Sequence, residues 1–169
     1  MANEHEAKVT IKRLGRGKHL HRIIPILDSS GKVIDRVVKP LMVEVRARDL
    51  MQILVGSAIL AIPAAYTEET WNLGEQLPMP NILILGIVSI LFIALFVYYN
   101  FYRHFFKNYV FDYFKRVISI YLISMIVVGL LLTLIQKCPW DTDIMLAIKR
   151  IIVVSFPASM SAAVSDILK

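Results

Sequence analysis

The sequence has a single cysteine, Cys138, among its 169 residues. One cysteine excludes an intramolecular disulfide and any metal centre built from several thiolates. The chain also has no glycine-rich phosphate loop, no nucleophile placed beside a base and no histidine cluster with the spacing of a metal site. These absences argue against an enzyme, and we expect neither a metal nor another cofactor.

Charged residues are sparse after residue 49, where four long apolar stretches fill most of the chain. Hydrophobic residues make up 57% of the sequence and the mean hydropathy is +0.62, whereas soluble domains are about 45 to 50% apolar. A bilayer core takes about 20 apolar helical residues to cross, and no stretch alternates as a barrel strand would. The sequence therefore predicts an all-α membrane protein with four transmembrane helices, over about residues 49–71, 81–102, 116–136 and 143–168.

Basic residues are nearly absent from two of the three loops that connect these spans. The loop after span one has none and the loop after span three has only Lys137, whereas 11 of the 19 Lys and Arg precede span one. The positive-inside rule therefore predicts cytoplasmic N- and C-termini, in a multi-pass protein of the plasma membrane. This distribution also explains the net charge of +6 without a nucleic-acid partner.

Residues 1–48 are expected to form a separate basic, cytosolic segment that contains no signal-peptide core. Two β-branched runs, at 23–27 and 32–38, flank an Asp-Ser-Ser-Gly turn and predict a β-hairpin. Leu41 to Val45 is a candidate for a further strand after Pro40. An isolated hairpin is marginally stable in water, so we expect it to lean on neighbouring subunits or on lipid headgroups.

Acidic residues gather at the predicted outer side. Glu68 and Glu69 follow span one, and Trp71 is expected to hold them at the membrane interface. Repeated by symmetry in an oligomer, these acids would concentrate cations at a pore mouth. The alternative is that they are solvated loop residues.

Lys149 and Arg150 lie within span four. If Trp140 marks the interface, Arg150 lies about 15 Å deeper, where a charge is costly and usually functional or paired. Alternatively, residues 141–150 form an interfacial turn and 151–168 alone span the membrane. A buried Arg150 could pair with Glu68 or Glu69, or bind an anion.

Span four is also rich in small and hydroxyl side chains, with Ser155 and Ser159 four residues apart. Small residues at that spacing let helix backbones approach closely in lipid. Close packing in the bundle and the lining of a wet path or oligomer axis both remain open. Two acids near span ends receive structural interpretations: Asp49 as the N-cap of span one, and Asp166 as a helix-end residue that meets basic loops.

Several short motifs together resemble those of a known prokaryotic family. They are Arg48-Asp49-Leu50, Ala61-Ile62-Pro63, Thr67-Glu68-Glu69-Thr70-Trp71, Leu95-Phe96-Val97-Tyr98-Tyr99-Asn100, Leu131-Leu132-Thr133-Leu134-Ile135, Pro139-Trp140 and Phe156-Pro157-Ala158-Ser159. Over roughly residues 40–169, the chain resembles the integral membrane proteins classed as domain of unknown function 2391. The resemblance implies four spans and no particular activity, with the N-terminal segment as an addition found in some members.

These observations predict a homo-oligomeric ion channel or pore-like transporter. Four short helices enclose little space, so the path would form on a symmetry axis, with cation preference from Glu68 and Glu69 and hydroxyls from Ser155 and Ser159. The expected partners are the lipid bilayer, other copies of the chain and inorganic ions. The alternative is a non-transporting scaffold, or a subunit that binds lipid or a partner. A wet axis of acids and serines favours transport, whereas a dry, sealed bundle favours the scaffold.

Overall fold

The computed structural model describes residues 10–14, 19–28, 33–40, 45, 47–103 and 109–168. The chain divides into two compact units, Met1–Glu44 and Val45–Lys169.

The first unit contains a three-stranded antiparallel sheet in the order β1-β2-β3. Its strands are β1 (Thr10–Leu14), β2 (His19–Leu27) and β3 (Val33–Pro40). The predicted hairpin is present as β2 and β3, and β1 is an addition that the sequence reasoning missed. The strand considered at 41–45 falls almost wholly outside the described residues.

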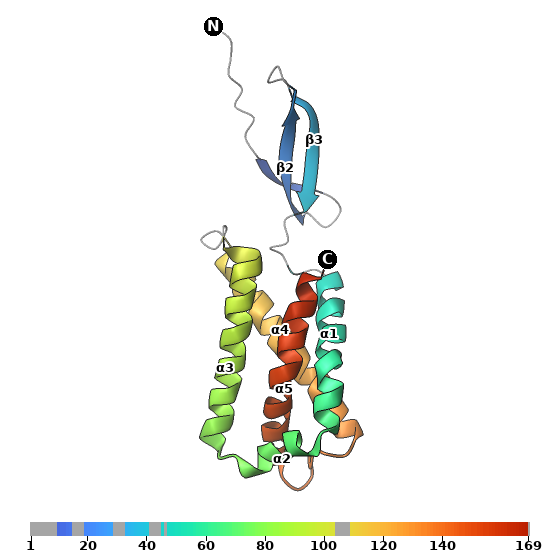
Figure 1. The fold of residues 1–169 in the computed structure, drawn as a ribbon, viewed down its shortest axis with the longest axis vertical. Coiled ribbons are helices and arrows are strands. Elements are labelled where there is room, and N and C mark those ends of the chain that lie inside the picture. Colours follow the sequence, from blue (N-terminus) through green and yellow to red (C-terminus); the bar gives the residue numbers. More distant parts are fainter. Residues whose placement is uncertain are drawn as a thin grey trace. The chain divides into compact units, whose positions relative to one another are not determined.

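The second unit is a helix bundle (Figure 1). Its helices are α1 (Ala47–Tyr66), α2 (Glu68–Gln76), α3 (Met79–Val97), α4 (Val110–Leu134) and α5 (Ile144–Ile167). A π-helical turn, η1 (Tyr98–Tyr102), continues α3. In the described part of the chain, the four long helices are long and apolar enough to cross a membrane. The predicted all-α membrane fold with four spans is therefore confirmed.

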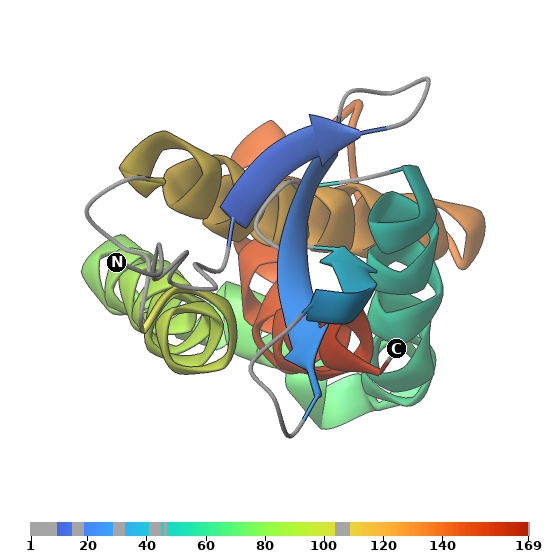
Figure 2. The same ribbon diagram turned by 90° about the horizontal axis from the view of Figure 1, so that it is seen from above.

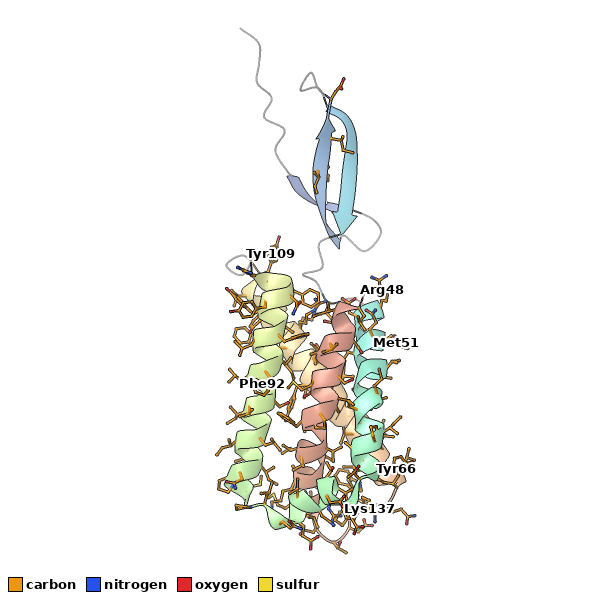
Figure 3. All side chains as sticks on the ribbon, viewed as in Figure 1. Arg48, Met51, Tyr66, Phe92, Tyr109 and Lys137 are labelled. Atoms are coloured by element: carbon orange, nitrogen blue, oxygen red, sulfur yellow. The ribbon has the colours of Figure 1, made fainter. Side chains whose placement is uncertain are left out.

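The two ends of the bundle differ in what they contain. The N/C end holds the start of α1, η1, the start of α4 and the end of α5, and Arg48 and Tyr109 mark it in Figure 3. The α2 end holds α2 and the loop over residues 135–143, and Tyr66 and Lys137 mark it in the same view.

Span one is shorter than the predicted 49–71. Helix α1 ends at Tyr66, and Thr67 takes an extended conformation (φ −89°, ψ 116°) before the separate helix α2 begins. The Thr67 hydroxyl donates to the carbonyl of Pro63 at 2.8 Å and helps satisfy the end of α1. Glu68 and Glu69 then occupy the first turn of α2, where negative charge complements the helix dipole.

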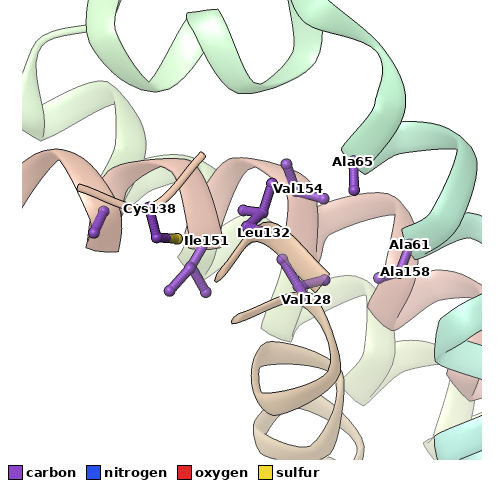
Figure 4. Close-up of a cluster of buried hydrophobic side chains, with 9 residues drawn as sticks. Ala61, Ala65, Val128, Leu132, Cys138, Ile151, Val154 and Ala158 are labelled. Atoms are coloured by element: carbon purple, nitrogen blue, oxygen red, sulfur yellow. The ribbon is translucent and has the colours of Figure 1, made fainter. Parts of the chain in front are cut away.

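Helix α5 lies at the centre of the bundle, in contact with each of the other four helices. Seen along the bundle, it lies between α1 and α3 (Figure 2). Near the α2 end, small and branched side chains of α1, α4 and α5 form a buried cluster around Ile151 and Val154, with Cys138 at its edge (Figure 4). Large apolar side chains also cover the outside of the bundle, as expected for helices that face lipid.

Candidate functional site

Three charged side chains meet inside the N/C end of the bundle. Arg116 on α4 donates through Nη2 to Oδ2 of Asp49 on α1 at 2.8 Å. Its Nε lies 3.4 Å from Oδ2 of Asp166 on α5. All three side chains are 0% exposed. We call these three residues the buried ion cluster.

The helical period turns each of these charges inward. On α1, Asp49 lies on a stripe of fully buried residues that repeats every four positions through Ile53, Ser57, Ala61 and Ala65. The buried residues of α4 recur in the same way: Tyr113, Arg116, Val117, Ile120, Ser124, Val128 and Leu132. Each charge therefore belongs to the face that packs on a neighbouring helix.

An aromatic wall covers the buried ion cluster from η1. The guanidinium carbon of Arg116 lies 4.0 Å from the centre of the Phe101 ring, a cation–π contact. Tyr102 is 0% exposed and packs edge-on against Tyr113, with ring centres 5.4 Å apart. The wider π-helical turn adds a residue to the helix at this point, and both neighbouring aromatics contact α4.

Polar groups continue from Asp166 along α5 into the bundle. Ser155, Ser159, Ala162 and Asp166 are spaced four, three and four residues apart and are all 0% exposed. The hydroxyls of Ser159 and Ser89, on α3, share a hydrogen bond of 2.8 Å. Ser155 Oγ is buried with no hydrogen-bond partner among the described residues. We call Ser155, Ser159 and Asp166 the polar stripe, which extends roughly 16 Å at about 1.5 Å per residue.

Pro157 leaves one backbone carbonyl beside this stripe without its usual helical hydrogen-bond donor. It lies inside α5 and has no N–H to donate to the carbonyl four residues earlier, that of Val153. Ser155 and Ser159 were predicted as pathway residues. They flank a segment of α5 that lacks one backbone hydrogen bond. Both serines lie in the interior of one bundle, not on its outer surface.

Basic residues at the α2 end fasten α2 to α5. Arg150 donates through Nη1 to the carbonyl of Lys137 at 2.7 Å and through Nη2 to Glu75 at 3.3 Å. The Trp71 ring lies 4.9 Å from the Arg150 guanidinium carbon and 4.3 Å from Lys137 Nζ. Gly74 lets α2 approach closely, because a Cβ there would lie 2.8 Å from Cγ of Arg150. We call Trp71, Glu75, Lys137 and Arg150 the α2 clamp.

The clamp shows where the predicted charges of span four lie. Helix α5 is continuous from Ile144, so Arg150 lies six residues, or about 9 Å, into the helix. The Arg150 side chain is 11% exposed, and its carboxylate partner is Glu75 and not Glu68 or Glu69. Lys149 donates to the carbonyl of Leu77 at 2.8 Å, just after α2.

The predicted outer acids precede the clamp residues Trp71 and Glu75 on α2. Glu68 and Glu69 are exposed on the first turn of α2. The structure thus brings Trp71, Lys149 and Arg150 to one end, and it places Ser155 and Ser159 five and nine residues beyond Arg150, about one and a half and two and a half turns further along α5. It does not bring Glu68 and Glu69 to the serines.

The buried ion cluster was missed in the sequence reasoning. Asp49 is the third residue of α1 and binds Arg116, so the predicted N-cap role is wrong. Asp166 was expected to meet basic residues at the helix ends, and its partner is Arg116 near the start of α4, a residue that the sequence analysis did not single out. The spacing of these residues could have revealed the cluster, because each one lies three or four positions from another buried residue on its helix.

The remaining candidates for reactive chemistry are metal ligands and the single cysteine. In the described part of the chain, no group of three or more His, Cys, Asp or Glu residues is placed to hold a metal ion. Cys138 lies in the loop before α5, and burial raises the pKa of its thiol. A protonated thiol is a poor nucleophile, so Cys138 is suited to packing.

Four apolar helices that expose apolar faces and bury a charged cluster define an integral membrane protein with four spans. The chain matches the family described as "Putative integral membrane protein (DUF2391)" over residues 29–168. It belongs to this family, as the motif resemblance predicted. The match begins further toward the N-terminus than residue 40 and includes β3. Comparisons with curated proteins and with solved structures gave no match.

Proposed function

We propose that this protein moves cations across a membrane through the interior of its own helix bundle. The polar stripe of α5 is the path, and the buried ion cluster at the N/C end binds the cation or proton. The observation that carries this proposal is that Ser155, Ser159 and Asp166 share one buried face of α5 and that Asp166 also belongs to the ion cluster.

The free-energy cost of burying a charge inside a membrane supports this assignment. A charged side chain inside a membrane protein is costly, and such residues commonly mark ion pathways and proton relays. Here Arg116 is shared between two carboxylates, at 2.8 Å from Asp49 and 3.4 Å from Asp166. A proton or cation on Asp166 would compete with the guanidinium and leave Arg116 with Asp49. The cluster therefore has two arrangements, one with a proton or cation bound at Asp166 and one without it. A binding site for transport requires two such states.

The proposed path lies within each subunit, whereas the path predicted from the sequence lay on a symmetry axis between subunits. Ser155 and Ser159 are 0% exposed in the single chain, which favours an internal route. Self-association remains part of the proposal, because it would multiply Glu68 and Glu69 around an outer mouth and strengthen their attraction for cations. The positive-inside rule orients the N/C end toward the cytoplasm of a prokaryotic cell.

The runner-up function is a scaffold that transports nothing. The complete burial of the polar stripe supports the scaffold, because buried small residues and serines also allow helices to pack closely in lipid. In that case the basic first unit would act at anionic headgroups or on a partner. The two functions differ in whether water ever reaches Ser155.

Thiol labelling separates them in the full-length chain. Cys138 is first replaced by serine, and Ser155→Cys is then compared with Leu130→Cys, a position 61% exposed on the outer, lipid-facing surface. In membrane vesicles, a water-soluble and membrane-impermeant thiol reagent should label the Ser155→Cys variant and spare the Leu130→Cys variant. Cations at high concentration should slow labelling at Ser155→Cys by occupying the path.

A third substitution, Asp141→Cys in the exposed turn at the α2 end, gives the rate for a freely accessible thiol. Equal and negligible labelling at Ser155→Cys and Leu130→Cys, in protein that unfolds as cooperatively as the parent, would show a dry bundle. That result would favour the scaffold.

A further inference from the structure

A groove of about 370 Å³ lies between α1 and α5 at the N/C end of the bundle. Its lining includes Met51 and Val55 from α1, and Ser165 and Leu168 from the end of α5. A Cβ on Gly56 would lie 2.3 Å from Cβ of Ser165, so the two backbones almost touch at the floor. The volume lies within the range of about 300 to 1,000 Å³ that is usual for ligand pockets.

The chemistry of this groove is that of an amphiphile site. Met51 is 61% exposed and Val55 57% exposed, so the apolar wall opens outward from the bundle. Arg48 stands at the N/C rim, and Figure 3 shows Arg48 and Met51 on the outer side of α1. The neighbouring Asp49 turns inward to Arg116 and is 0% exposed. The rim charge that faces outward is thus positive.

Few polar groups line the inside of the groove. Gln52 donates through Nε2 to the carbonyl of Leu168 at 2.8 Å, which ties the start of α1 to the end of α5. Apart from Gln52 Oε1 and the Ser165 hydroxyl, the remaining lining offers mainly carbon atoms to a ligand, with a single guanidinium at the open end. A ligand complementary to this arrangement has an apolar tail and one anionic head.

We propose that the groove binds one acyl chain of an anionic phospholipid, whose phosphate pairs with Arg48. A second copy of the chain fits less well, because a helix about 10 Å wide would fill this volume with less than one turn. An acyl chain is narrow enough to follow the groove from Arg48 toward Gly56. The site does not depend on whether the protein transports ions.

Native mass spectrometry of the full-length protein in detergent tests this site. Phosphatidylglycerol and phosphatidylcholine with identical acyl chains are added separately, and the lipid-bound fraction is measured. We expect the wild type to bind phosphatidylglycerol about fivefold more tightly, since one surface Arg contributes about that factor toward an anionic lipid. Arg48→Gln should abolish the preference.

Two further variants make the assignment specific. Arg103→Gln removes an exposed cation at the same end of the bundle, outside the groove, and should keep the preference. Val55→Trp should fill the groove and weaken binding of both lipids, with Met51→Trp as a second filling variant if the first fails to fold.

Three results would overturn the proposal. The first is equal binding of both lipids by the wild type. The second is an equal loss of preference in Arg48→Gln and Arg103→Gln, which would reveal only general surface charge. The third is a change of oligomer mass in Val55→Trp without any change in lipid binding, which would make the groove a contact between copies.

Discussion

Replacing Arg116 with methionine should destabilise the helix bundle by about 3 to 5 kcal/mol, the usual cost of removing one partner from a buried ion pair. The variant keeps a long apolar side chain but leaves Asp49 and Asp166 without the guanidinium that lies 2.8 and 3.4 Å from their oxygens. Both carboxylates are 0% exposed, so they lose their charged partner without gaining the solvation of surface groups. The measurement is the free energy of unfolding of the purified protein in mixed micelles.

Arg103→Met is the matched control, because it removes an exposed arginine from the same end of the bundle. It should change stability by less than about 0.5 kcal/mol, as surface substitutions usually do. Acidification should stabilise Arg116→Met relative to wild type, since protonation neutralises the two stranded carboxylates. Adding Asp49→Asn and Asp166→Asn should restore much of the loss. Equal stability of Arg116→Met and Arg103→Met would show that the three charges do not form a buried cluster.

The second large effect is expected at Gly56, where α1 and α5 almost touch. In Gly56→Ala the new Cβ would lie 2.3 Å from Cβ of Ser165 and 3.2 Å from Cα of Ala162, a backbone atom that cannot rotate away. The helices must separate, and we expect a loss near the upper end of the usual 1 to 3 kcal/mol for overpacking. Unfolding in mixed micelles measures this loss as well.

Gly129→Ala serves as the control for Gly56→Ala. A Cβ at Gly129 would meet its nearest neighbour, Cδ1 of Ile151, at 3.6 Å, which is an ordinary contact. We expect little change there. Ser165→Gly in the Gly56→Ala background removes the clashing Cβ and should recover part of the loss. If both alanine variants are as stable as wild type, the close approach of α1 and α5 is not present.

The length and composition of the apolar stretches were sufficient to predict the four spans, because lipid leaves few alternatives to a continuous helix. The boundary of span one was harder to predict. The apolar stretch ends at Tyr66, but the predicted span continued through the polar residues 67–70 to Trp71 as an interfacial residue. The extended backbone at Thr67 and the bond of its hydroxyl to the Pro63 carbonyl end the helix before them. Strand β1 also escaped prediction, since its short basic segment has no strong alternation.

The candidate site was only partly predictable, for a different reason. Ser155 and Ser159 were recognised from spacing within one helix, which a sequence displays directly. The pairing of Arg116 with Asp49 and Asp166 depends on which helices pack together, and that is a property of the bundle. In the same way, Arg150 meets Glu75 because α2 folds back over α5 at Gly74. No spacing rule in the sequence selects Glu75 over Glu68 or Glu69.

The measurement that tests the central claim most directly is ion flux into liposomes that contain the purified, folded protein. K⁺, Na⁺, Ca²⁺, H⁺ and Cl⁻ gradients are applied separately to wild type, to Asp166→Asn and to Asp141→Asn, which removes an exposed acid at the α2 end. The account predicts cation flux that Asp166→Asn abolishes and Asp141→Asn preserves, with Glu68→Gln plus Glu69→Gln weakening only the cation preference. Absence of flux in every gradient, or flux of Cl⁻ alone, would contradict it.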